Sequence, residues 1–164
     1  MIWRLRKKAT LPCPCGYLGS SVRSCRCTPD QVSRYQARLS GPLMDRIDLH
    51  VDVAPLPPDQ LLHTAPGERS DAVRARAQAA RDRALARQGC SNQALGGGDL
   101  DAQVRLDAAA AQFVAQAAAQ LAWSARGTHR TLKIARTIAD LAASATVQVA
   151  HVAEAMQYRR LVVR

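Results

Sequence analysis

Residues 40–53 read Ser-Gly-Pro-Leu-Met-Asp-Arg-Ile-Asp-Leu-His-Val-Asp-Val, a turn followed by a short charged segment and an alternating run. In that run Ile47, Leu49, Val51 and Val53 fall on one side, and polar side chains fall on the other. Alternation of apolar and polar residues at this period predicts a half-buried strand. A strand needs neighbours, and few other runs of this kind occur in the chain.

Arg46 precedes the alternating run, at the point where the chain would enter a sheet. An arginine fixed there could reach a phosphate on a neighbouring molecule, because the guanidinium group matches the geometry of phosphate oxygens. It could equally form a surface ion pair with Asp45 or Asp48, as structural ion pairs are common near functional charges. The residues alone leave both interpretations open.

The composition indicates a helical protein with a polyanionic partner. The chain has 164 residues, of which 48% are hydrophobic and only 4% aromatic, and much of the hydrophobic fraction is alanine. Closely packed helices suit this composition better than a sandwich or barrel. The net charge of +10 favours nucleic acid, nucleotide or an acidic membrane surface. Because the sequence shows neither a membrane span nor a convincing signal peptide, we expect a cytoplasmic protein.

Four of the five cysteines form two Cys-x-Cys pairs, Cys13 with Cys15 and Cys25 with Cys27, joined by a turn-rich loop. Four thiolates could hold a tetrahedral Zn²⁺ ion, although paired cysteines in zinc fingers usually have two or more residues between them. Disulfides are less expected in a reducing cytosol. Free thiols on a flexible loop are the alternative to a zinc site.

A short helix is predicted after the cysteine loop, because Thr28 or Asp30 could be its N-cap and Pro29 suits its first turn. Three prolines within 55–58 then make a stiff connector, where we place a domain boundary. The chain is thus divided into 12–57 and a helical part, 58–164. Residues 1–11 match neither part, and we expect them to be disordered.

A long basic helix is predicted from Ser70, as a capping residue, to about Gln88, with Gly89 ending it. Arg76, Arg83 and Arg87 line one of its faces. Such a row of cations suits the phosphates of nucleic acid, although a solvated helix face is the commoner outcome.

The triple glycine at 96–98 predicts a flexible loop, and it is not a phosphate-binding loop because no Gly-Lys-Ser/Thr follows. Beyond it, hydrophobic spacing predicts three helices, over about 106–123, 124–143 and 149–160. We expect His151, in the last of them, to be a packed or capping residue.

The middle one of these helices has an apolar stripe and a basic side. The predicted buried residues are Ile134, Ile138 and Leu141, and the basic residues opposite are Arg130, Lys133 and Arg136. Arg130 lies near the N-terminus, where a cation opposes the helix dipole by roughly a few tenths of a kcal/mol. A bound phosphate or a neighbouring acidic side chain would compensate.

Four motifs, in order, resemble the C-terminal portion of the magnesium-chelatase-like AAA+ ATPases. They are Pro-Cys-Pro-Cys-Gly at 12–16, Ser-Gly-Pro-Leu-Met-Asp-Arg-Ile-Asp-Leu-His at 40–50, Ser-Ala-Arg-Gly-Thr-His-Arg at 124–130 and Lys-Ile-Ala-Arg-Thr-Ile-Ala-Asp-Leu at 133–141. The resemblance implies a mostly α protein, with the C-terminal remnant of an αβ ATPase core followed by a helical lid domain of the bundle type.

The resemblance also implies roles for three arginines. Arg46 resembles the arginine finger that reaches the γ-phosphate bound by the neighbouring subunit. Arg130 resembles the sensor-2 arginine that contacts the nucleotide from the lid, and Arg126 is a further candidate for the same surface. Such cations would meet the charge that develops on the phosphoryl oxygens during transfer.

Family members bind ATP and Mg²⁺ and assemble into rings. The branch that acts in natural transformation uses ATP to drive branch migration and unwinding of DNA, and the Cys-x-Cys loop favours this branch over the chelatase subunits. Two alternatives to a motor fragment stay open. One is a stand-alone DNA-binding helical module stabilised by zinc, and the other is a degenerate product that only packs its helices.

The chain contains no Gly-x-x-x-x-Gly-Lys-Ser/Thr motif and no apolar strand ending in Asp-Glu, the elements that bind ATP and magnesium in this family. We therefore expect the isolated chain not to hydrolyse ATP and to bind it only weakly. Isothermal titration with ATP and Mg²⁺ measures this directly, and a sub-micromolar dissociation constant would contradict the expectation.

Overall fold

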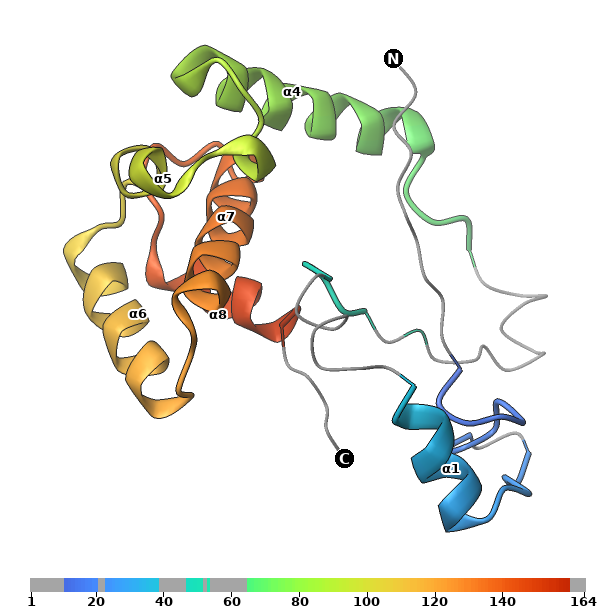
Figure 1. The fold of residues 1–164 in the computed structure, drawn as a ribbon. Coiled ribbons are helices and arrows are strands. Elements are labelled where there is room, and N and C mark those ends of the chain that lie inside the picture. The colour runs from blue at the N-terminus through green and yellow to red at the C-terminus, as the bar shows by residue number, and fades with distance from the viewer. Residues whose placement is uncertain (1–10, 21–22, 39–46, 52, 54–64, 160–164) are drawn as a thin grey trace. The chain divides into compact units, whose positions relative to one another are not determined.

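The computed structural model describes residues 11–20, 23–38, 47–51, 53 and 65–159. The described residues fall into two compact units (Figure 1). Residues 47–51 and 65–159 form the larger unit, and the others form the smaller one. Within the described ranges every regular element is a helix, apart from one parallel bridge between Leu106 and Val147. The expectation of a mostly α protein is thus confirmed.

The smaller unit contains the helix α1 (Pro29–Gln36), and its first turn is closed by a capping box. The Thr28 hydroxyl accepts a hydrogen bond from the Gln31 amide at 3.3 Å, and the Gln31 side chain accepts one from the Thr28 amide at 3.0 Å. At the other end the Gln36 amide group donates to the Pro12 carbonyl. The predicted helix start is confirmed, because these signals are local in sequence.

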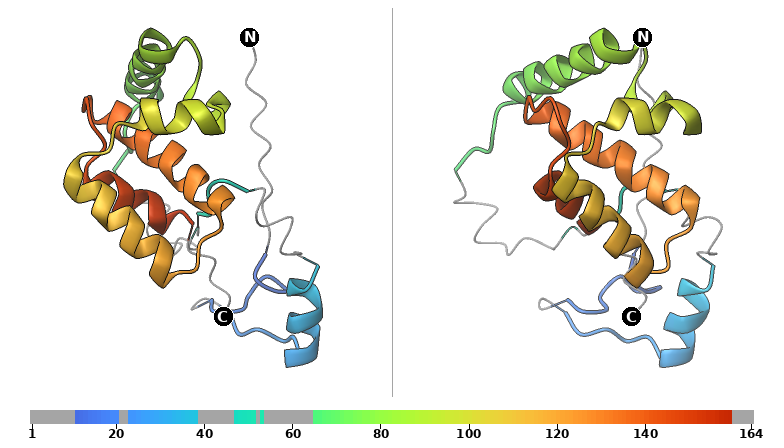
Figure 2. Two further views of the ribbon diagram at one scale, coloured as in Figure 1. Left: turned by 60° about the vertical axis from the view of Figure 1, so that its left-hand side comes forward. Right: turned by 90° about the vertical axis from the view of Figure 1, so that its left-hand side faces the viewer.

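The larger unit is built around α7, which contacts α4, η1, α5 and α8, while α6 contacts α8 (Figures 1 and 2). Its elements are α4 (Ser70–Gln88), η1 (Asn92–Ala94), α5 (Gly97–Val104), α6 (Ala108–Gln120), α7 (Ala125–Leu141) and α8 (Val149–Gln157). None of the helices in the described ranges is both long enough and apolar enough to cross a membrane.

The core of the larger unit consists of small and branched apolar side chains from four helices and the segment before α8. Its fully buried members include Leu100, Val104, Ala110, Ala135, Ala139, Val147, Val152 and Ala155. Four of these are alanines, which allow helix backbones to approach closely. The alanine-rich composition therefore serves helix packing, as predicted.

Helix boundaries in the larger unit follow local signals, with two differences from the sequence predictions. Gly89 ends α4 in the left-handed conformation at φ 72°, as predicted, but the N-cap is Arg69 and not Ser70. The triple glycine is not a flexible loop, because Gly96 caps α5 and Gly97 begins it. Leu100 and Val104, four residues apart on α5, are both buried, and this burial outweighs the low helix propensity of glycine.

The predicted buried stripe of α7 is wrong in part. Ile134 and Ile138 are only partly buried, Leu141 is 44% exposed, and Arg136, predicted on the opposite side, is completely buried. The reason is that α7 lies among several helices, so more than one of its faces is covered. A single amphipathic stripe describes a surface helix and not a central one.

Arg136 is accommodated by a buried network centred on the carboxylate of Asp140, one turn further along α7. Asp140 accepts hydrogen bonds from Arg136 at 3.0 Å, from Arg87 of α4 at 2.6 and 2.9 Å, and from Asn92 of η1 at 2.8 Å. Arg136 also donates to the carbonyls of Val104, Ser144 and Ala145. One carboxylate thereby connects α4, η1 and α7.

The network lowers the pKa of Asp140. Burial alone would raise this pKa, but the hydrogen bonds from Arg87 and Asn92 and the positive charge of Arg136 outweigh burial. Burial also lowers the pKa of Arg136, against the favourable pull of the Asp140 carboxylate. The guanidinium stays charged at neutral pH because its ordinary pKa is so high.

The strand predicted over residues 47–53 is not found in the described part of this stretch. Leu49, Val51 and Val53 are 51%, 67% and 88% exposed, and the residues described here have no regular structure. A strand needs a neighbouring strand for its backbone groups, and the described residues provide a different partner. The His50 amide donates to the carbonyl of Tyr158, which caps the C-terminus of α8.

Replacing Asp140 with alanine should lower the free energy of unfolding by about 3–5 kcal/mol, because it leaves the charge of Arg136 buried without a counterion. Urea unfolding at neutral pH measures the loss. Asp82→Ala is the matched control, since Asp82 on α4 is exposed and accepts one hydrogen bond from Gln78. It should change stability by less than about 0.5 kcal/mol.

The stability of the parent protein and that of Asp140→Ala should also respond differently to acid. A carboxyl whose folded-state pKa lies below its ordinary value stabilises the fold at neutral pH, and this stabilisation is lost as the pH falls through the lowered pKa, below about pH 4. The acid-induced loss should therefore be smaller in Asp140→Ala than in the parent. Equal losses in both proteins would contradict a stabilising role for the ionised Asp140.

Candidate functional site

The start of α7 presents the predicted sensor arginine. The Ser124 hydroxyl accepts a hydrogen bond from the Gly127 amide at 3.1 Å, so Ser124 is the N-cap of α7. Arg126 is exposed in this first turn, and Arg130 lies in the next turn of the helix.

Arg130 forms an ion pair with Asp48, with 3.2 Å between its Nη1 and the Oδ1 of the carboxylate. The arginine side chain is 22% exposed and the aspartate side chain 49%. Of the two compensations expected for a cation near this helix start, the structure contains the acidic side chain. Together with the hydrogen bond from His50 to Tyr158, the pair attaches residues 47–51 to the ends of α7 and α8.

The predicted arginine finger, Arg46, lies outside the described residues. It precedes Asp48 by two positions in the sequence. The segment attached to α7 is therefore the direct continuation of the chain from Arg46, although the sequence alone gave no sign that Asp48 would pair with Arg130.

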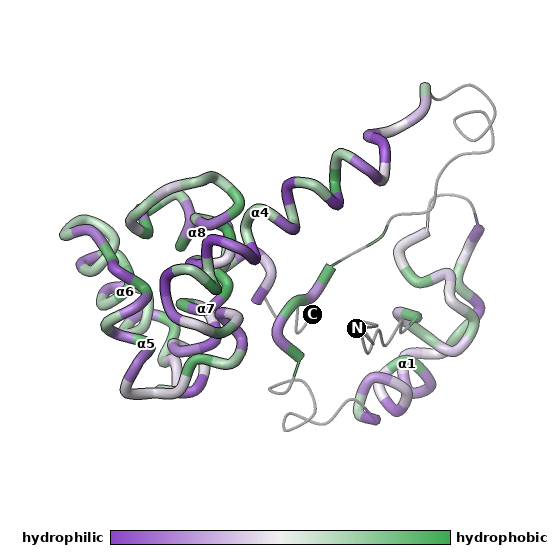
Figure 3. The backbone as a smooth tube through the Cα atoms, turned by 90° about the horizontal axis from the view of Figure 1, so that it is seen from above, coloured by the Kyte–Doolittle hydropathy of each residue, from purple (hydrophilic) through white to green (hydrophobic). Residues whose placement is uncertain are grey.

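The three arginines predicted as a nucleic-acid surface have different environments on α4. Arg76 is exposed and pairs with Glu68 at 2.6 Å, and Arg83 donates to the backbone carbonyl of Asp140 at 2.9 Å. Arg87 is partly buried in the ion pair with Asp140. Figure 3 shows hydrophilic and hydrophobic residues alternating along the whole of α4. Contact with nucleic acid stays a prediction for this helix, and Arg87 also joins α4 to α7.

An open cleft of about 590 Å³ lies beside this junction. Its lining includes Arg83, Arg87 and Asp140, together with Arg105, which follows α5 in the left-handed conformation at φ 51°. Sequence reasoning missed Arg105 because it stands alone between two helices, outside any motif or periodic run. Three guanidinium groups against one carboxylate make the cleft electropositive.

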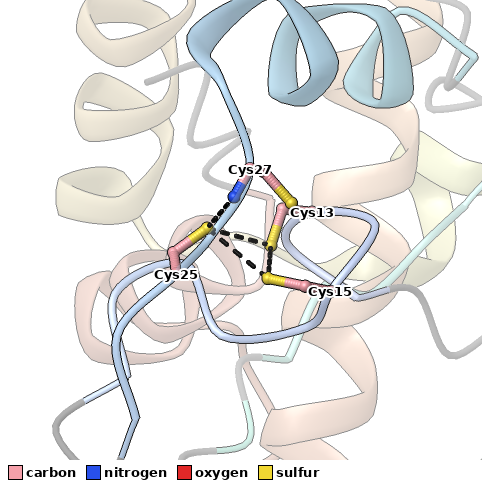
Figure 4. A group of neighbouring side chains, drawn as sticks. All are labelled: Cys13, Cys15, Cys25 and Cys27. Carbon is pink, nitrogen blue, oxygen red and sulfur yellow. Dashed lines mark hydrogen bonds between the residues drawn. The ribbon is translucent and has the colours of Figure 1, made fainter.

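The four clustered cysteines come together in the smaller unit (Figure 4). The sulfur of Cys13 lies 3.4 Å from that of Cys15 and 3.7 Å from that of Cys25, and the sulfurs of Cys15 and Cys25 are 3.5 Å apart. All four sulfurs, that of Cys27 included, lie within 4.8 Å of one another. Every cysteine is a free thiol, and Cys90 belongs to the larger unit, where it packs against the core.

The surroundings of the sulfurs shift the pKa values of the cysteines in opposite directions. Hydrogen bonds from the backbone at Arg26 and Tyr17 stabilise the Cys15 thiolate and lower its pKa to about 6. Cys27 has a favourable backbone hydrogen bond at Cys15, but burial and the neighbouring sulfurs outweigh it and raise the pKa of Cys27 to about 12. Crowding of four sulfurs thus favours one thiolate at the expense of another.

Two family models match consecutive parts of the chain. The model described as magnesium chelatase, subunit ChlI, matches residues 7–61, and the model described as magnesium chelatase, subunit ChlI C-terminal, matches residues 67–159. The second match covers more than half of the chain and coincides with the main part of the larger unit. The chain therefore belongs to the magnesium chelatase ChlI family, and the resemblance carried by its four motifs is confirmed.

Relatives with curated sequences support the same assignment. Competence protein ComM of Haemophilus influenzae is 38% identical over 153 residues, which cover 92% of this chain and 30% of ComM. The uncharacterized protein YifB of Escherichia coli is 38% identical over 152 residues, 92% of this chain and 29% of YifB. The uncharacterized protein Rv2897c of Mycobacterium tuberculosis is 34% identical over 156 residues. The chain spans less than a third of the length of these relatives.

Substituting Arg130 or Asp48 with alanine should cost less than about 1 kcal/mol of folding stability, because the aspartate is half-exposed and solvent screens the pair. Urea unfolding of both variants measures the change. A loss as large as that expected for Asp140→Ala would show that the pair holds the fold together. A small loss leaves Arg130→Ala suitable as a functional probe.

Proposed function

We propose that this chain is the lid-bearing C-terminal portion of a ring-forming, ATP-driven motor of the magnesium chelatase family, whose complete form acts on DNA as ComM-like proteins do. Residues 12–57 would belong to the ATPase core and 58–164 to the lid. The two family matches meet between residues 61 and 67, which supports a boundary near the prolines at 55–58.

The observation that carries this proposal is the ion pair between Arg130 and Asp48. It joins a lid helix to the segment that continues from Arg46, so that two proposed nucleotide-contacting arginines belong to connected parts of the chain. Arg130 is 22% exposed, and Asp48, with which it forms an ion pair, is half-exposed. A half-exposed pair contributes only about 0–1 kcal/mol, so replacing it costs little.

A triphosphate should bind the Arg130 guanidinium more strongly than the Asp48 carboxylate does. Its phosphate groups carry several negative charges and present paired oxygens that a guanidinium binds in bidentate fashion. In this proposal Arg130 exchanges Asp48 for a phosphate when ATP and Mg²⁺ are bound elsewhere in the motor. Arg126, exposed one turn earlier, lies at the same end of α7 and could add to the positive potential there.

Arg46 would act on the nucleotide of the neighbouring subunit. A cation supplied to the transferring phosphoryl group stabilises the charge that develops on its oxygens, and such a finger raises turnover by about 10³–10⁵-fold. This role requires a ring of like subunits, which we propose for the complete protein. We further propose a cytoplasmic location and DNA as the polyanion on which the motor acts, and the net charge of +10 supports the latter.

A chimeric protein tests the proposal. The 153-residue portion of H. influenzae ComM that matches this chain is replaced by the chain itself, and ATP hydrolysis and the frequency of natural transformation are measured. We expect both to be retained. Arg46→Ala should lower kcat by at least about 10³-fold, and Arg130→Ala should raise KM and lower kcat.

The matched control is Arg74→Ala, which removes an exposed arginine from α4 and should leave ATP hydrolysis unchanged. Parental ATP hydrolysis by the Arg130→Ala chimera would refute the proposed role of Arg130. If the chimera assembles but hydrolyses no ATP, and the isolated chain still binds DNA with an affinity that falls steeply with salt, the alternative of a stand-alone DNA-binding module is correct.

A further inference from the structure

We propose that Cys13, Cys15, Cys25 and Cys27 bind one zinc ion, and that this ion holds the fold of the smaller unit. The proposal is independent of the ATP-dependent function, since it concerns only the loop before α1. It rests on the spacing of the sulfur atoms, the lack of an apolar core among the described residues of this unit, and the turns that bring the two cysteine pairs together.

The distances among the sulfurs of Cys13, Cys15 and Cys25 are close to those of a tetrahedral metal site. Four sulfurs about 2.3 Å from a central zinc ion lie about 3.8 Å from one another. The three sulfur–sulfur distances among Cys13, Cys15 and Cys25 are 3.4, 3.5 and 3.7 Å. A disulfide would bring two sulfurs to about 2.05 Å. The cluster is thus too open for disulfides and close to the size that a zinc ion requires.

The identity of the ligands limits the choice of metal. Four thiolates are soft donors, which select zinc over magnesium or calcium, and a site with four protein ligands leaves no position for a substrate or a reactive water. The ion would therefore be structural and not catalytic. Its role would differ from that of the magnesium that accompanies ATP in the proposed motor.

The described residues of the smaller unit contain little else that could hold it together. Cys13 is the only buried residue among its described residues, 11–20, 23–38 and 53, and α1 has no buried residue. A segment of this size without an apolar core needs a crosslink or a metal ion to keep one structure. Hydrogen bonds among cysteine sulfurs are weak and would not supply this.

Two glycine turns shape the loop so that the cysteine pairs meet. Gly16 and Gly19 have φ angles of 82° and 76°, in the left-handed region that favours glycine, and the Gly16 amide donates to the Cys13 carbonyl at 3.0 Å. Further along, the guanidinium of Arg23 lies 4.9 Å from the centre of the Tyr17 ring. These turns bring the two cysteine pairs to one place in the loop.

The position of the cluster connects the metal to α1. Cys27 directly precedes Thr28, the N-cap of α1, and the far end of the helix returns to the loop through the hydrogen bond from Gln36 to Pro12. An ion held by all four sulfurs would fix both the loop and the start of the helix. Loss of the ion should therefore release residues 11–20 and 23–38 together.

Metal analysis of the purified full chain tests the binding. We expect about one zinc ion per chain, and replacement by Co²⁺ should give the visible absorption bands of tetrahedral thiolate coordination. Cys15→Ser and Cys25→Ser should each lose the zinc, while Cys90→Ser, which removes the one cysteine outside the cluster, should keep it. A metal-free chain with reduced cysteines, a chain with disulfides in the cluster, or loss of zinc in Cys90→Ser would overturn the proposal.

Limited proteolysis of the same chain tests the structural role. After the zinc is released with a mercurial reagent, trypsin should cut faster after Arg23, Arg26 and Arg34, and mass spectrometry identifies the products. Cleavage within the larger unit should not change, and its helical circular dichroism should remain. Unchanged cleavage at the three arginines after zinc release would show that the ion does not hold this unit.

Discussion

The carboxylate of Asp140 is the constraint on which the helical unit depends. It receives Arg87 from α4, Asn92 from η1 and Arg136 from its own helix, and Arg136 in turn donates to the end of α5 and to the segment that leads toward α8. A buried guanidinium is costly unless it is neutralised and hydrogen-bonded. Asp140 and three backbone carbonyls do this for the two Nη atoms of Arg136, whereas its buried Nε has no hydrogen-bond partner among the described residues. The elements that supply these partners are therefore held in one arrangement.

This constraint fixes the direction of α7 and so the place of Arg130. The proposed nucleotide contact lies at one end of the helix and the buried network near the other, with Ala135 packed in the core between them. A rigid helix allows Arg130 to exchange one partner for another without rearrangement of the core. Precise placement of a charged group on a rigid element is what phosphoryl transfer requires.

Signals that act between neighbouring residues were predictable from sequence. Thr28 and Ser124 cap their helices, Gly89 ends one, and the Nδ1 of His151 accepts a hydrogen bond from the Gln148 amide, the capping role expected for it. The two Cys-x-Cys pairs also predicted that the four cysteines could come together in one cluster. In each case the interacting groups lie within a few residues of one another or share one unusual residue type.

Features that depend on distant partners were not predictable in the same way. The alternation in residues 47–53 suggested a strand, but alternation indicates only which residues share a face and not whether a neighbouring strand exists. Arg136 looked exposed because its burial depends on carbonyls 8, 9 and 32 residues away. The helix dipole predicted that a negative charge would compensate Arg130. It did not predict that Asp48 would supply this charge.

The described residues of the two units include few large apolar side chains in their interiors, and the units are stabilised in different ways. The helical unit buries alanines and a compensated ion pair, whereas the smaller unit buries only Cys13 among its described residues. If thiolates and a metal replace a core there, the stability of the two units responds to different conditions, one to acid and the other to chelation or oxidation. The lid helices, with Arg130 on them, could then stay folded while the cysteine loop is opened.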